Sequence, residues 1–375
     1  MPFYQSDYLK HKELYRSFVV EEILNQATQF DKSESIPRDF FYKLAKQEIL
    51  GAAISKKWGG VESNYITLGL MHEELGRGLC SIQNIVTVCG MVCRPLLRFG
   101  TMEQKNNYLG KIARGEMIVA LALTEPDVGS DLQCVETRIV DDGNAYLVTG
   151  IKSYITLGQI ADLFLVLAKL DNKPIALFIE KETPGVTIVP IKDILGMRAN
   201  MLAEIHFENC RVPQKNQLGS VGMGWTHVMQ IALDEGRFTT AFGCVGLGQA
   251  CLDAVLEYTN KRKQFGSLIK DHPLVQKMMT EMIVDIKASR ALCHRAAVSR
   301  ENGDFNFMTE TLVAKYAASK MAVRVANHAL QIFAAAGFTT NYPVERYYRD
   351  AKAMEIIEGT SQMYEMHIPQ AYITD

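Results

Sequence analysis

The spacing of apolar residues changes twice along this chain. From about residue 7 to 118, apolar side chains recur at helical spacing, as in Phe40, Leu44 and Ile49, and glycines punctuate the runs. Between about 119 and 219, short apolar runs rich in β-branched residues predict strands. These runs are residues 146–149, 163–168, 175–179 and 186–189. From about 222 to 370 helical spacing returns, over residues 223–260, 275–301 and 311–336.

This order predicts an α+β protein with an N-terminal helical bundle, a middle β domain and a C-terminal four-helix bundle. We place the domains at residues 1–118, 119–219 and 220–375. Turn residues at 142–144 and 184–185 favour a small β-barrel or sandwich in the middle domain. A chain of 375 residues is long enough for two or three packed units, and we find no repeat or low-complexity linker in it.

Charge narrows the classes of partner. Forty basic and 42 acidic residues give a formal net charge of −2, without a long run of either sign. The charge therefore favours neither a nucleic-acid nor a membrane partner. The N-terminal segment mixes charged and apolar residues, and no window approaches the roughly 18 apolar residues of a membrane span, so we expect a cytoplasmic protein.

The eight cysteines are scattered along the chain. Cys89 and Cys93 are the nearest approach to a ligand pair, and no second Cys or His pair stands at zinc-like spacing. We therefore expect reduced, mostly buried thiols and no metal site.

Two segments of the predicted β domain carry the first candidate chemistry. Residues 121–131 read LALTEPDVGSD, and residues 150–156 read GIKSYIT. Each could be an ordinary strand with a polar turn, but together they resemble the flavin-binding segments of the acyl-CoA dehydrogenase superfamily. The resemblance implies an FAD cofactor. A flavin needs fixed hydrogen-bond partners at its ring edges, and a Gly-Ser turn permits close backbone approach.

The resemblance also implies roles for single residues of these segments. Leu123 and Thr124 would bind the isoalloxazine ring, and Ser130 would reach a phosphate of FAD or the pantetheine arm of the substrate. Tyr154 would lie against the flavin, where Trp is common in the family, and the hydroxyl of Thr156 would bond flavin N5.

Residues 195–198 and 205–213 resemble the end of the family's β domain, and we interpret them as scaffold. Residues 261–266 (KRKQFG) resemble the segment that offers Arg262 and Phe265 to the FAD of a neighbouring subunit, and Gln331 belongs to the same FAD site. An Arg fork suits phosphate, although a basic helix end capped by Gly would look the same. An FAD shared between subunits implies a homodimer or homotetramer.

The C-terminal segment is the most informative. Residues 342–346, 349–352 and 356–362 resemble the family signature in which the Glu before Gly-Thr is the catalytic base. Glu358 is that residue here, with Gly359 at the substrate and Thr360 and Gln362 at FAD.

A base for this chemistry must be held in place and partly desolvated. We therefore expect Glu358 to lie in an apolar pocket, formed partly by Ile356 and Ile357, that raises its pKa. The backbone N–H of Glu358 and a ribityl hydroxyl of FAD would polarise the thioester carbonyl.

Some branches of the family carry the base on an earlier helix, immediately before an Arg. That position is Gly236 here, so the alternative base is absent. Asp234 and Arg237, on either side of it, match positions that line the mouth of the ligand site. They could equally form a surface ion pair.

Some positions depart from the family pattern. Alanines occupy residues 334–336, where a glycine-rich turn frequently meets the FAD pyrophosphate, and Pro273 replaces a frequent Gln after His272. The first change predicts a looser or shifted backbone approach to FAD, and the second removes one polar contact. Residues 242–246 and 349–359, with the Ala-rich turn, resemble the branch that oxidises C3 units bound to acyl carrier proteins.

We therefore predict an FAD-dependent dehydrogenase of acyl thioesters. The first hypothesis is oxidation of a C3 unit on an acyl carrier protein, to make hydroxymalonyl or aminomalonyl extender units for polyketide, nonribosomal peptide and antibiotic biosynthesis. The alternatives are a short- or medium-chain acyl-CoA dehydrogenase of fatty-acid or amino-acid catabolism, an oxidase, and a non-catalytic interaction protein on the same scaffold. By family analogy, an electron-transfer flavoprotein would be the electron acceptor.

Overall fold

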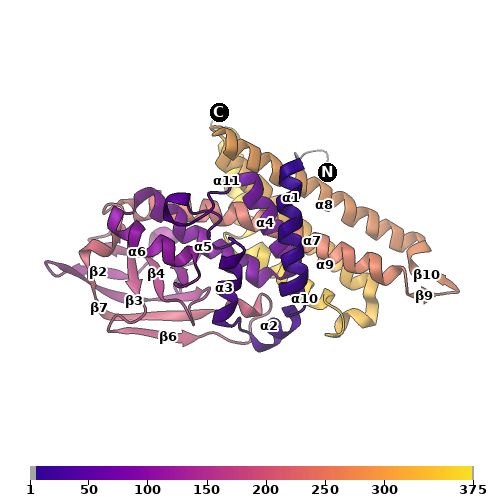
Figure 1. The fold of residues 1–375 in the computed structure, drawn as a ribbon, viewed down its shortest axis with the longest axis horizontal. Coiled ribbons are helices and arrows are strands. Elements are labelled where there is room, and N and C mark those ends of the chain that lie inside the picture. Colours follow the sequence, from indigo (N-terminus) through magenta and orange to yellow (C-terminus); the bar gives the residue numbers. More distant parts are fainter. Residues whose placement is uncertain (1–5, 374–375) are drawn as a thin grey trace.

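The computed structural model describes residues 6–373. Along the chain a first group of helices is followed by the strands of a sheet and then by a second group of helices (Figure 1). Thr101 and Gln104 form a reciprocal capping box at the start of α6, and Asn64 caps α4 through the backbone N–H of Thr67. The N-terminal helices are α1 (Ser6–Phe18), α2 (Ala27–Ser33), α3 (Arg38–Lys46), α4 (Tyr65–Gly78), α5 (Cys80–Phe99) and α6 (Met102–Ala113).

The middle of the chain forms a mixed sheet in which strand β4 is the branch point. One end of β4 pairs in parallel with β1 and the other end pairs in parallel with β2, while β5 lies antiparallel on its opposite edge. The order along the main path is β6-β7-β3-β2-β4-β5-β8. The strands are β1 (Val119–Ala122), β2 (Arg138–Asp141), β3 (Ala145–Ile155), β4 (Leu163–Leu170), β5 (Lys173–Glu180), β6 (Val186–Pro190), β7 (Ala203–Pro213) and β8 (Gln217–Leu218).

The C-terminal part is helical again, which confirms the predicted α+β fold with helical ends. Helix α7 packs against α4, α5, α8 and α9, so it lies at the centre of the helical body. The elements are α7 (Gln230–Thr259), the hairpin β9 (Lys263–Gln264) and β10 (Ser267–Leu268), then α8 (Pro273–Asn302), α9 (Phe307–Phe333), α10 (Val344–Ile356) and α11 (Ser361–Ile373).

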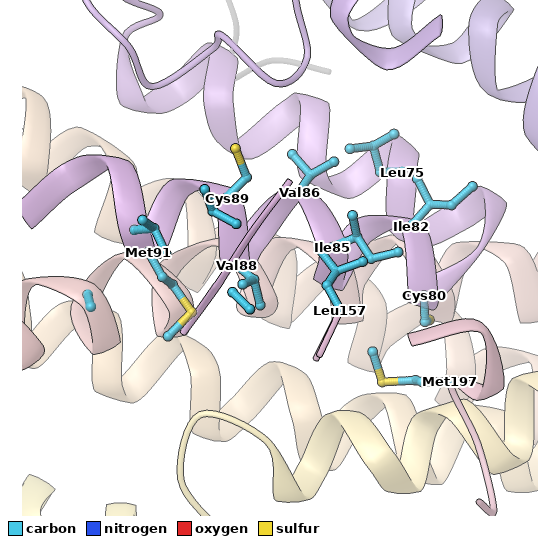
Figure 2. Close-up of a cluster of buried hydrophobic side chains, with 14 of the residues drawn as sticks. Leu75, Cys80, Ile82, Ile85, Val86, Val88, Cys89, Met91, Leu157 and Met197 are labelled. Carbon is cyan, nitrogen blue, oxygen red and sulfur yellow. The ribbon is translucent and has the colours of Figure 1, made fainter. Parts of the chain in front are cut away.

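Two helices are long and apolar enough to meet the composition of a membrane span, Cys80–Phe99 and Gly224–Thr259. The expectation that no window approaches such a span was therefore wrong for these segments. Their windows are 83% and 78% buried within the protein. Figure 2 shows why for α5: Cys89 and Met91 point from opposite sides of the helix, and neighbouring elements cover both. Apolar residues all around a helix are typical of a core helix as well.

A loop of the β domain is tied to α10, the helix that leads to Glu358. The backbone N–H of Met197 donates to Asp350 at 2.6 Å, and a Cβ on Gly196 would lie 2.4 Å from the carbonyl oxygen of Arg349. Arg349 itself pairs with Asp31 of α2 and with Glu345. The segment interpreted as scaffold therefore holds α10 against the β domain, and Arg349 holds it against the N-terminal helices.

The Ala-rich turn after α9 contains a backbone conformation that suits glycine. Ala334 has φ 50° and ψ −134°, a region that is essentially restricted to Gly. Residues Ala334–Phe338 then form a 3₁₀ turn. Pro273 occupies the first turn of α8, where its missing N–H costs nothing, and His272 before it contacts Ser267 and the carbonyl oxygen of Gln264.

We expect Ala334→Gly to stabilise the protein, because it removes the steric cost of that conformation, on the order of 1 kcal/mol. Thermal unfolding of the two proteins at equal concentration measures the effect as a rise in midpoint. The matched control is Ala336→Gly, whose residue has no positive φ. That variant should be unchanged or slightly less stable, by about 0.5–1 kcal/mol. A lower midpoint for Ala334→Gly would contradict the proposed strain.

Candidate functional site

Glu358 lies in the short turn between α10 and α11. Its φ is 60° and that of Gly359 is 110°, so consecutive residues adopt left-handed backbone. Tyr364 donates its hydroxyl to the carbonyl oxygen of Glu358 at 2.8 Å, and Nε of Arg237 approaches the same oxygen at 3.4 Å. A non-glycine residue in this conformation persists only where its surroundings hold it. The turn is therefore fixed from both α7 and α11.

The carboxylate of Glu358 points at the bare backbone of Gly236. A Cβ on Gly236 would lie 2.5 Å from Oε2 of Glu358 and 2.8 Å from the sulfur of Met91. Oε2 is buried and accepts no hydrogen bond from any described residue. Gly236 is the position that the sequence resemblance assigned to the alternative base. The structure thus places the two positions in contact, and only the absence of a side chain at 236 leaves room for Glu358.

Burial raises the pKa of Glu358 to about 7, against the opposing charges of Arg237 and Lys315. The predicted direction of this shift agrees with the structure. The predicted pocket was wrong for Ile356, which is 52% exposed. Met91 and Gly236 form the wall instead, because the left-handed turn swings the Glu358 side chain away from its neighbour in sequence.

Lys315 was missed from the sequence. Its side chain is fully buried, and Nζ donates to the carbonyl oxygen of Met354 at 2.9 Å, in the last turn of α10. It also lies 5.3 Å from the ring of Tyr364. Burial lowers the pKa of Lys315 to about 8. A charged residue in an Ala-rich, apolar helix was the available signal, since a buried lysine needs a specific partner.

The positions flanking Gly236 do not pair with each other. Asp234 binds Arg300 at 2.7 Å in a buried ion pair, and Arg237 contacts the backbone of Glu358. The alternative of a surface ion pair between Asp234 and Arg237 was therefore wrong. Arg300 is further covered by the rings of Tyr65, Phe238 and Phe307.

The segments predicted to hold the flavin ring meet at the ends of β1 and β3. The backbone N–H of Ser153 donates to the carbonyl oxygen of Thr124 at 2.8 Å, so Thr124 lies beside Tyr154. Tyr154 has φ 58° and is 61% exposed. Lys152, which was not predicted from the sequence, supports this edge from inside the protein. It is buried and donates to the carbonyl oxygen of Leu123 at 2.9 Å and to Glu125 at 2.7 Å.

Thr156 connects this edge to α5. Its hydroxyl contacts Asn84 Oδ1 at 3.3 Å, which also accepts from Asn200 at 3.0 Å. Oδ1 of Asn200 is buried and unpartnered within residues 6–373. Asn84 and Met91 are two helical turns apart on α5, or roughly 10 Å, so one helix joins the Thr156 edge to the Glu358 carboxylate.

These features fit a flavin. The Thr156 hydroxyl and the spare amide oxygen of Asn200 are the kinds of groups that meet ring nitrogens and carbonyls, and the exposed Tyr154 ring offers a flat face. No cluster of three or more His, Cys, Asp or Glu side chains is placed to hold a metal in the part of the chain that the structure describes. All eight cysteines are free, and Cys134 alone is exposed, so the thiols are mostly buried as predicted.

Other predicted cofactor residues lie away from this edge. Arg262 is exposed and Phe265 is 96% exposed on the β9–β10 hairpin, which projects from the end of the helical body opposite the sheet (Figure 1). Gln331, Ser130 and Gln362 are also exposed, whereas Thr360 is half-buried beside Glu358. The fold thus brings together Leu123, Thr124, Tyr154 and Thr156, and separates them from the hairpin.

Comparison with known proteins matches three family models in order. Residues 6–116 match the acyl-CoA dehydrogenase N-terminal domain, residues 120–210 the middle domain and residues 222–373 the C-terminal domain. The mitochondrial short-chain specific acyl-CoA dehydrogenase of Rattus norvegicus is 33% identical over 95% of this chain and 88% of its own.

Solved structures agree over nearly the full length. Glutaryl-CoA dehydrogenase of Mycobacterium smegmatis in complex with FADH2 superposes with a TM-score of 0.95, at 25% identity, over 100% of this chain and 96% of its own. The prolyl acyl carrier protein oxidase AnaB gives a TM-score of 0.92 at 30% identity, over 98% of this chain and 99% of its own.

The raised pKa of Glu358 predicts a pH-dependent stability. Between pH 4.5 and 7 the folded protein keeps a proton on Glu358 that the unfolded chain releases, so this stabilisation is lost as the pH rises through 7. The amide of Glu358→Gln does not titrate, so this variant does not lose stability in that pH range through position 358. We expect its thermal midpoint to rise relative to the wild type as the pH increases from 4.5 to 8.

The matched control for this prediction is Glu355→Gln. Burial of Glu355 is outweighed by Lys352 at 2.7 Å and by Ser361, so its pKa is lowered. Its loss should destabilise the protein above about pH 4.5, which is the opposite sign. Equal midpoint shifts for Glu358→Gln at pH 5 and pH 8 would contradict the assigned pKa.

Proposed function

Because this chain belongs to the acyl-CoA dehydrogenase family, whose models match its N-terminal, middle and C-terminal parts, we propose that it dehydrogenates a short acyl-CoA thioester between its α- and β-carbons, with Glu358 as the base. Enzymes of this family are FAD-dependent oxidoreductases, and this chain is one of them. The observation that carries the proposed chemistry is the buried, unpartnered Oε2 of Glu358 opposite Gly236.

FAD, when bound, supplies the acceptor for the hydride that leaves the β-carbon. The edge formed by the ends of β1 and β3 would hold its ring, and the turn after Glu358 would hold it from the other side. The proposed FAD contacts from this subunit are Leu123, Thr124, Tyr154, Thr156, Thr360 and Gln362, and Ser130 would reach a phosphate of FAD or the pantetheine arm of the substrate. The proposed contacts from the neighbouring subunit are Arg262, Phe265 and Gln331.

Glu358 takes the α-proton onto its carboxylate. A pKa of about 7 leaves a large fraction of the carboxylate ionised at neutral pH and still makes it a stronger base than a solvated glutamate. Arg237 and Tyr364 hold the carbonyl oxygen of Glu358, so the turn cannot rotate when the proton is transferred. The backbone N–H of Glu358 would polarise the thioester carbonyl, which acidifies the α-carbon.

A second candidate is the carrier-protein reaction, which the sequence put first. Similarity to the prolyl acyl carrier protein oxidase AnaB supports it. The curated relatives support the acyl-CoA alternative better, because their names specify short-chain acyl-CoA substrates. We therefore place acyl-CoA first. An electron-transfer flavoprotein as acceptor, a cytoplasmic location and a homodimer or homotetramer remain predictions.

We expect Glu358→Gln to lower turnover by roughly 10²–10⁴-fold, because the amide cannot take the proton. Anaerobic bleaching of the bound flavin by butyryl-CoA measures the step directly. The pH profile of wild-type kcat/KM should rise with an apparent pKa near 7. Glu355→Gln, three residues away and paired with Lys352, should keep the wild-type profile. Normal turnover by a Glu358→Gln protein that binds flavin would contradict the assignment of Glu358 as the base.

The carrier is decided by comparing the same short acyl group on CoA and on an acyl carrier protein. We expect kcat/KM on CoA to exceed that on the carrier protein by at least tenfold. Mass spectrometry of the protein-bound acyl group and flavin bleaching would follow both reactions. Oxidation of the carrier-bound group alone would replace the first candidate by the second.

We expect Arg262→Ala to lower FAD retention, because its guanidinium is proposed to meet the phosphates of FAD in a neighbouring subunit. The flavin-to-protein absorbance ratio after gel filtration measures the loss. Lys263→Ala removes an exposed charge from the same hairpin and is the matched control. Equal flavin content in wild type and Arg262→Ala would contradict the assignment of this hairpin.

A further inference from the structure

Among the described residues three lysines are buried, and one of them has an unusual partner. Lys12 and Lys152 each pair with a glutamate, at 2.6 Å and 2.7 Å. Lys315 of α9 donates instead to a neutral backbone carbonyl, that of Met354, at 2.9 Å. Burying an ammonium group costs free energy that a carboxylate partner offsets best. Helix packing alone therefore does not account for a lysine at this position.

The carbonyl oxygen of Met354 is available because α10 stops there. Within a helix each N–H donates to the carbonyl four positions before it, and Ile357 still donates to Ala353 at 3.1 Å. The next bond of this series would run from the N–H of Glu358 to Met354. Ile357 has ψ 156° and Glu358 has φ 60°, so the backbone turns away and that bond is not made.

Lys315 takes the place that this turn leaves at the end of α10. Met354 is 0% exposed, so its carbonyl oxygen needs a partner within the protein, and Nζ of Lys315 supplies it. The N–H of Glu358 then donates to none of the described residues. This N–H is the group proposed above to polarise the thioester carbonyl. Lys315 thus keeps free a donor that a continuing helix would use internally.

The charge of Lys315 acts on the same turn. Nζ lies 5.3 Å from the centre of the Tyr364 ring, and the hydroxyl of Tyr364 donates to the carbonyl oxygen of Glu358. The charges of Arg237 and Lys315 also oppose the effect of burial on the pKa of Glu358. One lysine is therefore in contact with both helices that flank the turn, α10 and α11.

The other groups that face Lys315 leave Glu358 as its electrostatic target. These groups are Cys244 and Arg237 of α7, Glu355 and Glu358 of α10 and its turn, and Tyr364 of α11. Burial raises the pKa of Cys244 to about 12 and also raises that of Tyr364, so neither carries a charge near neutral pH. Glu355 is already paired with Lys352 at 2.7 Å, whereas Oε2 of Glu358 has no hydrogen-bond partner among residues 6–373.

We propose that Lys315 is a positioning residue for the reaction. It occupies the Met354 carbonyl in place of the Glu358 amide, which leaves that amide for the substrate thioester, and its charge favours the ionised carboxylate of Glu358. The inference rests on the proposed function, because it takes Glu358 as the base. A lysine that only capped the C-terminus of α10 would stabilise the helix and leave the reaction unchanged.

The test compares FAD-loaded wild type, Lys315→Met and Lys315→Gln by flavin bleaching with butyryl-CoA, per bound flavin. Neither replacement carries a charge, so kcat/KM should rise at a pH higher than the wild-type value near 7, by roughly one pH unit. Lys315→Met also lacks a donor. Its kcat at high pH should fall by about tenfold or more, because the freed Met354 carbonyl competes for the Glu358 N–H. Lys315→Gln keeps an N–H donor and should lose less.

Two matched controls separate this role from the loss of any lysine. Lys12→Met removes a buried ammonium between α1 and α4, so it should lower the thermal midpoint and keep the pH profile. Lys320→Met changes a lysine of α9 that lies 5.3 Å from the ring of Tyr316 and 3.8 Å from Glu365, and it should also keep the profile. If Lys315→Met does not fold, Lys315→Gln still decides.

A wild-type pH profile and a wild-type kcat in the folded Lys315 variants would overturn this inference and leave the proposed function intact, even if their thermal midpoints fall. An equal shift of the profile in Lys12→Met would also overturn it, because the loss of any buried lysine would then have the same effect. Absence of bleaching by butyryl-CoA in the wild type would overturn the proposed function, and this inference with it.

Discussion

The contact between the Glu358 carboxylate and the bare backbone of Gly236 is the constraint on which the site depends. A methyl group at 236 would overlap Oε2, so the central helix must lack a side chain there. The surrounding structure then has to keep α10 and its terminal turn at that distance. Met197 holds Asp350 from the β domain, and Lys315 holds the last turn from α9. The β domain and α9 therefore both help to hold Glu358 at this distance from Gly236.

The sequence predicted the parts of this arrangement that depend on local pattern. Helical and strand periods gave the α+β order, and the segment around Glu358 resembled a known signature. Pairings between distant residues could not be predicted. Asp234 and Arg300 are 66 positions apart, and Lys315 meets Met354 across 39 positions. Such contacts depend on how helices pack, and no spacing along the chain encodes them. The prediction that Ile356 lines the pocket was wrong for the same reason, because the turn rotates Glu358 away from it.

The site buries polar atoms that have no partner in the described residues. Glu358 and Asn200 each bury an oxygen without a partner in the described residues, the first against α7 and the second beside the edge proposed for the flavin. Every such atom lowers stability, whereas a methyl group in its place would raise it. Ligand or proton binding removes that cost, so the interactions made during the reaction become stronger than those of the free enzyme. The stability lost at these atoms is therefore a condition for tight interactions at the site during the reaction.

Helix α5 links these demands, because one surface of it serves several roles. Asn84 faces the Thr156 edge proposed for the flavin, Met91 faces Glu358, and Gln83 and Thr87 hydrogen-bond to Thr239 of α7. A displacement of α5 would therefore disturb cofactor, base and substrate together, which explains why it is packed on all sides (Figure 2).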